Sequence, residues 1–301
     1  MTERVIEIAN PARLHVRDAQ LVIEPETGAV ATAPVSEVGV LLISNPRVTM
    51  TQAVLSRIAL EGGAVITCDE KFLPASLLLP VQAHYLQTER FAKQIETSSP
   101  ARKRYWRTIV RAKIRAQGKL LRRLHGSDGG LLPMAARVRS GDVENLEAQA
   151  ARRYWGLIFG DAKFRRGNDA QNQNRHLDYG YIVLRAATAR ALCAAGLHPS
   201  LGVQHHNRYD SFSLASDMME PFRPIIDERV FCWIQEHDPC APLDRETRGD
   251  LLGALTARYL VKGEERSLFD LLLRTANGLA RSICGEEAAF DPPDEFLLCG
   301  E

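Results

Sequence analysis

Residues 141–160 read GDVENLEAQAARRYWGLIFG and decide the fold of the larger part of the chain. Their apolar side chains recur at steps of three and four, at Val143, Ala150, Tyr154, Leu157 and Ile158. This period places them on one face of an α-helix, and Glu147 shares that face. A carboxylate among apolar side chains stays ionised only if a cation, a metal or hydrogen bonds replace the lost water. The stretch therefore predicts a packed helix and makes Glu147 a candidate site residue, unless its side chain reaches solvent at the edge of the stripe.

The overall composition sets broad limits. With 301 residues, the chain exceeds the usual size of one domain, so we expect two. No apolar run approaches the ~20 residues of a membrane-spanning helix, and the opening MTERVIEIANPARL lacks a secretory pattern. These features predict a cytoplasmic protein with no membrane partner. Six scattered cysteines form no CxxC pair, which argues against a zinc knuckle and against a disulfide framework.

The first part of the chain, residues 1–82, is predicted to be a β-rich domain. Short runs of β-forming residues occupy positions 5–8, 13–16, 20–24, 29–35 and 38–43, and turn-forming residues separate them. Residues 51–60 predict one helix that ends at Gly62-Gly63, and residues 64–68 predict a buried strand. This spacing is typical of a meander or a small sandwich.

Helical periodicity begins at residue 83. A polar break at residues 97–100 suggests a linker over residues 83–100, followed by a helical domain over residues 101–285 and an acidic tail over residues 286–301. Helices are expected at residues 250–261 and 267–284, among others. The tail carries apolar side chains such as Phe290 and Phe296, so it is either frayed or a docking segment. The predicted fold class is α+β, with an N-terminal β-rich domain before a larger all-α C-terminal domain.

Positive charge is concentrated in one stretch. Residues 102–123 contain ten basic side chains and no acidic one, and subtracting these ten charges from the net charge of +1 leaves −9 for the remaining chain. Four of the cations step by four along one side of the predicted helix, at Arg107, Arg111, Arg115 and Lys119. Like charges at this spacing repel one another, so the row favours a phosphate-binding surface. The alternative is a solvated helix face without a partner.

A second stretch, residues 201–224, contains candidate metal ligands. His205 and His206 lie in a predicted loop, and Asp217 and Glu220 lie three apart on the first turns of the following helix. A loop histidine and two carboxylates could bind one divalent ion. The alternative is that both acids are ordinary first-turn residues, which the helix dipole favours.

Four stretches together resemble the family of CRISPR-associated spacer-acquisition integrases, the universal first protein of those systems. They are NPARLHVRDAQLVIE, NPRVTMTQAVLSRIALEGGAVITCDEKFLPASLLLP, NLEAQAARRYWGLIFG and LDYGYIVLRAATARALCAAGLHPSLGVQHHNRYDSFSLASDMMEPFRP. The resemblance covers nearly the whole chain. The N-terminal sequence and the chain length most resemble those of members from systems with a single large RNA-guided nuclease (type II).

The resemblance implies a metal site for Mg²⁺ or Mn²⁺. By motif, its ligands are Glu147, His205 and Glu220, with His206 and Asp217 as second choices. The chain departs from the family at Asp178, a position that is often Asn in relatives, and an extra negative charge there would weaken DNA binding.

The implied reaction is metal-dependent DNA integration. The 3′-hydroxyl of a short DNA fragment, the prespacer, attacks a phosphodiester at the edge of the CRISPR repeat, and with water in place of the hydroxyl the site gives endonuclease activity. The implied partners are DNA, a second copy of the chain that dimerises through the N-terminal domain, and a small ferredoxin-like CRISPR-associated protein that bridges two dimers.

The charge pattern, rather than a motif, suggests which residues contact phosphates. They are the row of four on the long helix and a second cluster, Lys163, Arg165 and Arg166. The competing hypothesis is a non-catalytic DNA-binding scaffold in which the acids are structural. A small-molecule metallohydrolase is disfavoured because it leaves the basic helix unexplained.

Overall fold

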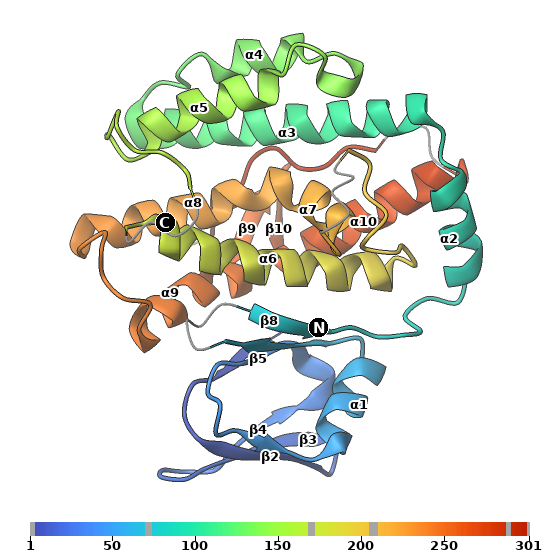
Figure 1. Ribbon diagram of the computed structural model, residues 1–301, viewed down its shortest axis with the longest axis vertical. Coiled ribbons are helices and arrows are strands. Elements are labelled where there is room, and N and C mark those ends of the chain that lie inside the picture. Colours follow the sequence, from blue (N-terminus) through green and yellow to red (C-terminus); the bar gives the residue numbers. More distant parts are fainter. Residues whose placement is uncertain (1–3, 70–73, 168–171, 205–209, 287–289, 300–301) are drawn as a thin grey trace.

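The structure is a computed structural model that describes residues 4–69, 74–167, 172–204, 210–286 and 290–299. A strand-rich N-terminal part packs beneath a larger helical part (Figure 1). The predicted α+β class and the order of the two parts are therefore confirmed. None of the described helices is long and apolar enough to cross a membrane.

The N-terminal part consists of two sheets with one helix. The first sheet has the strand order β1 (Arg4–Ile8), β5 (Val38–Ile43), β7 (Ala64–Cys68), β8 (Pro74–Leu78). The second has the order β4 (Ala31–Pro34), β3 (Gln20–Pro25), β2 (Ala12–Arg17), β6 (Thr49–Met50). Helix α1 (Gln52–Leu60) connects β6 to β7, and the short turn η1 (Val35–Glu37) precedes β5. β1, β5 and β7 are parallel, whereas β8 is antiparallel to β7.

Strand β5 explains why the two parts hold together. All six residues of its sequence VGVLLI are buried. Leu41 and Ile43 belong to the core between the two sheets and α1, whereas Val40 and Leu42 belong to the core of the helical part. Successive side chains of a strand point to opposite faces, so a strand covered on both faces must be apolar throughout. The strand-rich part is thus fixed to the helical part by a shared apolar core.

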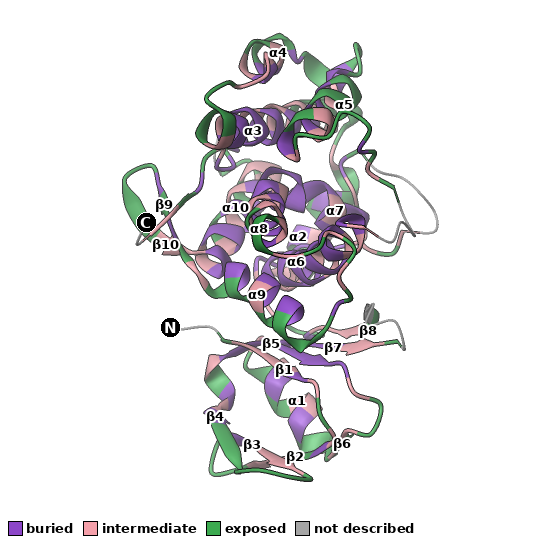
Figure 2. Ribbon diagram, turned by 90° about the vertical axis from the view of Figure 1, so that its left-hand side faces the viewer, coloured by how far each residue is buried: buried purple, intermediate pink, exposed green. Residues whose placement is uncertain are grey.

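The helical part is built around two long helices, α3 (Ser99–His125) and α6 (Asn174–Ala194). Figure 1 shows α4 and α5 on one side of α3, and α6, α7 and α8 on the other. Figure 2 shows that α6 is buried along most of its length. The remaining helices are α2 (Gln87–Glu96), α4 (Leu131–Arg137), η2 (Ser140–Asp142), α5 (Leu146–Ile158), α7 (Ser213–Met219), η3 (Glu220–Phe222), α8 (Arg223–Glu236), α9 (Arg245–Thr256) and α10 (Leu268–Cys284).

Helix α2 lies within the predicted linker and packs against the helical part. Arg90 donates a hydrogen bond to the carbonyl oxygen of Ala195 at 2.8 Å, and Gln94 donates to the carbonyl oxygens of His198 and Leu201 at 2.9 and 3.1 Å. Residues 87–96 are therefore an ordered helix of the helical part, although they lie before the polar break at residues 97–100.

The prediction of an all-α C-terminal domain is wrong in one place. Residues 250–261 were expected to be helical, but α9 ends at Thr256 and the chain continues as β9 (Arg258–Val261) and β10 (Glu264–Ser267), joined by Lys262 and Gly263. Both turn residues have left-handed backbones, with φ of 52° and 83°. A two-residue turn of this kind matches the twist of a hairpin, and the alternating burial along β9 buries one face of it. A third strand, β11 (Leu297–Leu298), completes this sheet.

The C-terminal segment, defined here as residues 290–299, is docked and not frayed. The ring of Phe290 packs edge-on against Tyr105 of α3, with ring centroids 6.1 Å apart, and Phe296 packs against Phe222 at 5.4 Å. Both phenylalanines are buried. Of the two predictions for the tail, the docking segment is correct.

Candidate metal centre and basic surfaces

Two carboxylates from distant parts of the chain converge on one buried cation. The ammonium nitrogen of Lys113, in the middle of α3, lies 2.6 Å from Oε1 of Glu147 on α5 and 2.7 Å from Oε2 of Glu220 in η3. The side chains of Lys113, Glu147 and Glu220 are 10%, 24% and 5% exposed. The structure thus brings together two of the three residues proposed as metal ligands. We call Glu147 and Glu220 the acid pair.

The position of Glu147 depends on how α5 begins. Gly141, Asp142 and Asn145 have left-handed backbones, which turn the chain sharply before the helix. The carboxylate of Asp142 then accepts hydrogen bonds from the backbone N–H groups of Leu146 and Glu147, both at 2.9 Å. These are two of the N–H groups that a helix N-terminus leaves without partners, so Asp142 fixes the first turn and with it Glu147.

The predicted apolar stripe of α5 is only partly correct. Ala150, Tyr154 and Ile158 are buried, but Val143 lies before the helix and is 74% exposed, and Leu157 is 42% exposed. The buried face is completed by Leu146 instead. Glu147 therefore lies at the flank of the buried face, where it reaches α3, and an ion pair replaces the water that its carboxylate loses.

Lys113 was not identified as a site residue from the sequence. It was counted among the basic residues of the long helix, although it lies on that helix's buried face, next to Ile109, Ile114 and Gln117. A lysine within an apolar face requires an acidic partner, and this is the signal that could have revealed it. Burial alone would lower the pKa of Lys113, but the charges of Glu220 and Glu147 outweigh burial and raise it. The ammonium group is therefore charged.

A second cation holds the other oxygen of Glu220. Nη2 of Arg223 lies 2.8 Å from Oε1 of Glu220, one helical turn away. The guanidinium of Arg223 also lies over the ring of Tyr181 on α6, 4.5 Å from its centroid. Glu220 is thus held from two sides, by Lys113 at one oxygen and by Arg223 at the other.

A buried carboxylate, Asp227 of α8, connects the helices behind the acid pair. It accepts a hydrogen bond from the hydroxyl of Tyr154 on α5 at 2.8 Å and another from the hydroxyl of Tyr181 on α6. Asp227 is fully buried, and burial raises its pKa from 3.8 to about 6 against the opposing effect of the two hydroxyls. Tyr154 lies two turns after Glu147 on the same helix, so this contact fixes α5 against α8.

Asp217, the second-choice ligand, binds backbone in the structure. Its Oδ2 accepts hydrogen bonds from the N–H groups of Val203 and Gln204, at 2.8 and 3.0 Å. The carboxylate therefore holds the chain immediately before His205. His205 and His206 lie outside the described residues, so the structure does not place the proposed histidine ligand. Within the part of the chain that is described, no group of three His, Cys, Asp or Glu residues is arranged to hold a metal ion.

The predicted phosphate-binding row of α3 is partly covered. Lys119 lies 2.8 Å from Asp294 and 3.1 Å from Glu295, and Arg115 lies 3.4 Å from Asp294. Successive residues of an α-helix are rotated by about 100°, so Arg111 and Arg115 leave α3 roughly opposite to Lys113. The row is therefore not fully exposed, because the C-terminal segment lies on it and supplies counter-charges.

The other half of the row is not paired in this way. Among the described residues, Arg107 and Arg111 have no carboxylate within ion-pair distance, and both are half-buried. Burial, together with the neighbouring charges of Arg115 and Arg107, lowers the pKa of Arg111. The effect of the two neighbouring arginines on this pKa is the repulsion expected between like charges four residues apart on a helix.

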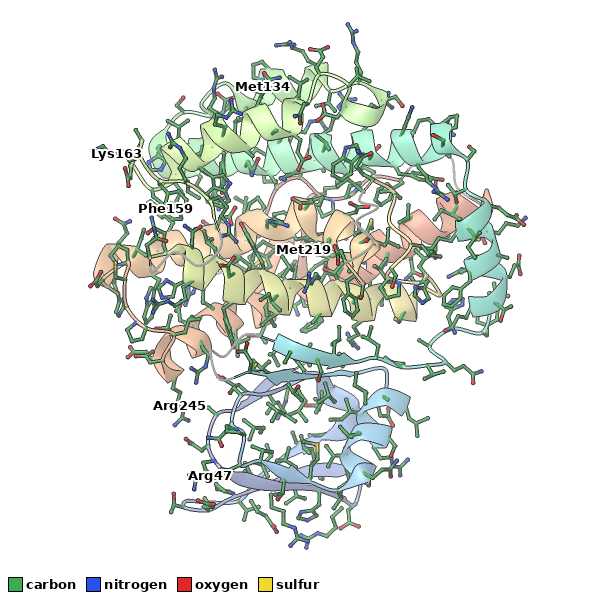
Figure 3. The ribbon with its side chains drawn as sticks, viewed as in Figure 1. Arg47, Met134, Phe159, Lys163, Met219 and Arg245 are labelled. Atoms are coloured by element: carbon green, nitrogen blue, oxygen red, sulfur yellow. The ribbon has the colours of Figure 1, made fainter. Side chains whose placement is uncertain are left out.

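The second basic cluster contains three side chains in different environments. Lys163 is exposed on the loop after α5 and points outward (Figure 3). Arg165 donates hydrogen bonds to the carbonyl oxygens of Ala162 and Phe164, both at 2.8 Å. Arg166 lies 2.5 Å from Asp178. The negative charge of Asp178 therefore neutralises one of the predicted phosphate contacts.

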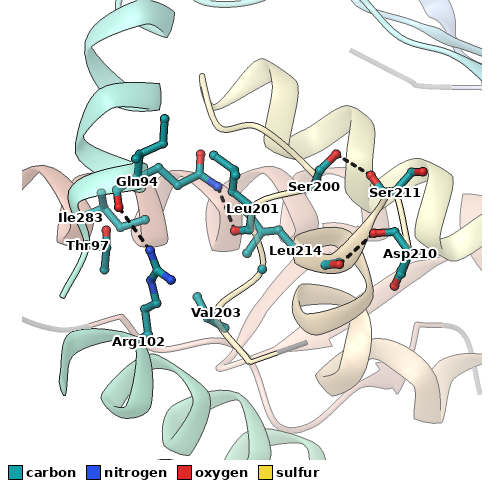
Figure 4. A pocket seen from close by; sticks show the side chains of 13 residues that line it. Gln94, Thr97, Arg102, Ser200, Leu201, Val203, Asp210, Ser211, Leu214 and Ile283 are labelled. Atoms are coloured by element: carbon teal, nitrogen blue, oxygen red, sulfur yellow. Dashed lines mark hydrogen bonds between the residues drawn. The ribbon is translucent and has the colours of Figure 1, made fainter. Parts of the chain in front are cut away.

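A pocket of about 450 Å³ lies between α2, the start of α3 and two segments of the chain, residues 200–203 and 210–214. Figure 4 shows Gln94, Arg102, Leu201, Val203 and Asp210 around it. None of the described residues that line this pocket belongs to the acid pair. Its connection to the site is Val203, whose N–H binds Asp217.

The donor set around Lys113 fits a divalent cation. Two carboxylate oxygens already converge on one positive charge, with the ammonium in the position that a cation would take. Mg²⁺ and Mn²⁺ prefer oxygen ligands, with imidazole as an accepted addition. Glu147 and Glu220 could therefore hold such an ion without rearrangement of the backbone.

Comparison with known proteins gives a family. A family model described as CRISPR associated protein Cas1 matches residues 7–239. The CRISPR-associated endonuclease Cas1 of Neisseria meningitidis (serogroup C, strain 8013) is 39% identical over 233 residues, which are 76% of this chain and 75% of that protein.

Solved structures share the fold at lower identity. A casposase bound to integration product has a TM-score of 0.78 at 18% identity and covers 97% of this chain and 93% of its own. A Cas6-RT-Cas1–Cas2 complex has a TM-score of 0.76 at 18% identity and covers 98% of this chain and 36% of its own. Because the family model spans more than half of the sequence and the Neisseria relative matches three quarters of it, the chain belongs to the Cas1 family of CRISPR-associated proteins.

Proposed function

We propose that this protein is a divalent-metal-dependent DNA integrase and endonuclease of CRISPR adaptation, which joins the 3′-hydroxyl ends of short DNA fragments to the CRISPR repeat. The observation that carries the proposal is the convergence of Glu147 and Glu220 on one cation position. The name of the Neisseria relative, an endonuclease, and the casposase bound to integration product support this reaction class.

The proposed site uses Glu147 and Glu220 as ligands to Mg²⁺ or Mn²⁺, with His205 or His206 as the nitrogen ligand. When bound, the ion would assist deprotonation of the attacking hydroxyl and neutralise negative charge that develops on the phosphate. Arg223 holds the second oxygen of Glu220, so the carboxylate cannot rotate away from the site. Asp217 fixes the backbone at Val203 and Gln204, which directly precede the two histidines in the sequence.

The partners are proposals as well. We propose DNA, both as prespacer and as CRISPR repeat, a second copy of this chain that pairs through the N-terminal part, and a ferredoxin-like second CRISPR-associated protein. The Cas6-RT-Cas1–Cas2 complex among the structural neighbours supports the last of these. The origin from a type II system rests on the N-terminal sequence and the chain length.

The phosphate contacts that the structure leaves open are Lys163, Arg107 and Arg111. Lys163 is exposed, and the two arginines have no carboxylate partner among the described residues. Arg115, Lys119 and Arg166 are paired with acids, so they can contact phosphates only if those ion pairs open. Such contacts position DNA without reading its sequence, which suits an enzyme that accepts fragments of any sequence.

The test is a half-site integration assay with Mn²⁺ and a labelled DNA fragment. Glu147→Gln should reduce strand transfer by at least about 100-fold, because a neutral amide is a poor ligand for a hard cation. The matched control is Glu144→Gln, an exposed acid that precedes the same helix, and it should be as active as the wild-type protein. Strand transfer that survives in Glu147→Gln would overturn the proposal.

The scaffold hypothesis gives a different set of results. It rests on the finding that the acid pair is neutralised by Lys113, as structural acids would be. It predicts salt-sensitive DNA binding, no metal-dependent strand transfer by the wild-type protein, and DNA binding unchanged in Glu220→Gln. Measuring DNA affinity beside strand transfer in the same variants therefore separates the two hypotheses.

A further inference from the structure

We infer that Lys113 is an internal counter-ion of the acid pair that the divalent ion must displace, so that this lysine sets the metal affinity of the site. The inference rests on the proposed function, because it concerns the same two carboxylates. It assigns a role to a residue that the proposed mechanism does not use.

Lys113 lies where a divalent ion bound to the acid pair would lie. Nζ of Lys113 lies 2.6 Å from Oε1 of Glu147 and 2.7 Å from Oε2 of Glu220. A magnesium or manganese ion held by these two oxygens would lie about 2.0–2.2 Å from each of them. An ion that binds the same two oxygens takes the place of the ammonium group between them, so the two cations exclude each other. Binding of the ion requires the ammonium group to move.

The ammonium group of Lys113 loses its ion pairs when it moves away from the acid pair. Among the described residues, Glu147 and Glu220 are the two carboxylates within ion-pair distance of Lys113. Its neighbours on α3, Ile109 and Ile114, are fully buried and apolar. A buried charge that loses its partner is strongly unfavourable, so displacement of Lys113 subtracts from the free energy of metal binding. A site without this lysine should therefore bind the ion more tightly.

Lys113, and not Arg223, is the cation that a divalent ion would displace. Arg223 binds Oε1 of Glu220, whereas Lys113 lies at Oε2. It can remain in place when an ion binds the other oxygen. The long, flexible stem of a lysine can withdraw its ammonium group while α3 stays fixed. Lys113 is thus the displaceable cation and Arg223 the permanent one.

The same arrangement makes a prediction for the metal-free protein. Without Lys113, the carboxylates of Glu147 and Glu220 would lose the positive charge that lies within 2.7 Å of an oxygen of each, and the two negative charges would repel each other. The lysine therefore stabilises the site when no ion is present. Its removal should lower stability in the presence of a chelator and make that stability depend on added metal.

The experiment measures Mn²⁺ affinity of the full-length protein by electron paramagnetic resonance of free Mn²⁺, after treatment with a chelator. The variants are Lys113→Met, which keeps the length of the side chain and removes its charge, and Lys113→Gln. The control is Lys93→Met, an exposed lysine on α2. We expect both Lys113 variants to bind Mn²⁺ more tightly than wild type, by at least about tenfold, because a competing positive charge is gone. Lys93→Met should match the wild type.

Thermal unfolding provides a second measurement, which also applies if a Lys113 variant folds poorly. The midpoint of thermal unfolding of Lys113→Met should be lower than that of wild type in chelator, and Mn²⁺ should raise it by more than it raises the wild-type midpoint. If Lys113→Met can be purified only with Mn²⁺, loss of the fold on adding chelator supports the inference in the same way.

Two results are decisive in the other direction. In the first, Lys113→Met and Lys113→Gln bind Mn²⁺ no more tightly than the wild-type protein, and the single variant Glu147→Gln does not bind it. The inference is then wrong, but the proposed metal site stands. If Glu147→Gln leaves Mn²⁺ binding of the wild-type protein unchanged, the proposed function itself fails, and the inference fails with it.

Discussion

Lys119 of α3 and Asp294 of the C-terminal segment lie 2.8 Å apart, although 175 positions separate them in the sequence. Asp294 also pairs with Arg115, and Glu295 pairs with Lys119. The buried ring of Phe296 holds the segment in this position, against Phe222. Two of the four cations in the predicted phosphate-binding row of α3 are therefore already neutralised by the chain's own C-terminal acids.

We predict that removing these acids strengthens DNA binding. In the double variant Asp294→Asn, Glu295→Gln, Arg115 and Lys119 have no counter-charge and can contact phosphates. The slope of log affinity against log salt concentration should become more negative by about two, because each phosphate that the protein neutralises contributes about −0.9 to this slope. Fluorescence anisotropy with a labelled duplex at several salt concentrations measures this slope. The control variant Asp18→Asn, Glu26→Gln removes two negative charges from turns of the N-terminal part. An equal steepening in this control would refute the prediction.

We predict that Asp217 anchors the backbone of Val203 and Gln204 in the absence of metal. In Asp217→Ala, the N–H groups of Val203 and Gln204 lose a charged acceptor, and a hydrogen bond to a charged group contributes roughly 1.5–3 kcal/mol. Amide hydrogen exchange at these two positions should therefore accelerate by about tenfold or more in metal-free protein. If exchange is unchanged and only metal affinity falls, Asp217 acts as a ligand and not as an anchor.

The buried Asp227 predicts a pH dependence of stability. Its folded-state pKa is raised to about 6 from 3.8, so the folded protein binds this proton more tightly than the unfolded chain. The resulting stabilisation is present at low pH and is lost as the pH rises through about 6. Between pH 4 and pH 8 the loss amounts to about 2 kcal/mol, because one pKa unit corresponds to about 1.4 kcal/mol.

The variant Asp227→Asn isolates this effect. Its amide oxygen can still accept a hydrogen bond from Tyr154 or Tyr181, but it does not ionise. The free energy of unfolding of the variant minus that of wild type should rise by about 2 kcal/mol from pH 4 to pH 8. Urea denaturation at four pH values measures it. A difference that stays constant over this range would show that Asp227 does not titrate in it.

The ion pair between Arg166 and Asp178 predicts a gain of DNA affinity on neutralisation of the acid. Asp178→Asn leaves the guanidinium of Arg166 without its counter-charge, so the salt dependence of DNA binding should steepen by about one. A double-mutant cycle with Arg166→Gln identifies the cause. The gain of DNA affinity caused by Asp178→Asn should vanish in the Arg166→Gln background. If it persists there, its cause is only the loss of repulsion between Asp178 and DNA.

Much of the secondary structure follows from local pattern. Trp106, Ile109 and Ile114 share the buried face of α3, and their spacing in the sequence is enough to predict this, because helical spacing decides which side chains share a face. The strand over residues 64–68 and the helix over residues 52–60 follow from the same kind of signal. The hairpin of β9 and β10 does not, because its four-residue strands are too short for periodicity to separate them from a helix end.

The site itself divides in the same way. The sequence by itself determined which acids could form a site, since Glu147 and Glu220 each stand out within an amphipathic helix or its first turn. Only the tertiary structure decided that a lysine 34 positions before Glu147 lies between them, and that Asp217 binds backbone instead. Periodicity fixes the face of one helix, whereas the partner of a buried charge depends on how separate helices pack. The same reason explains the C-terminal segment, whose acids find the basic row only in the folded chain.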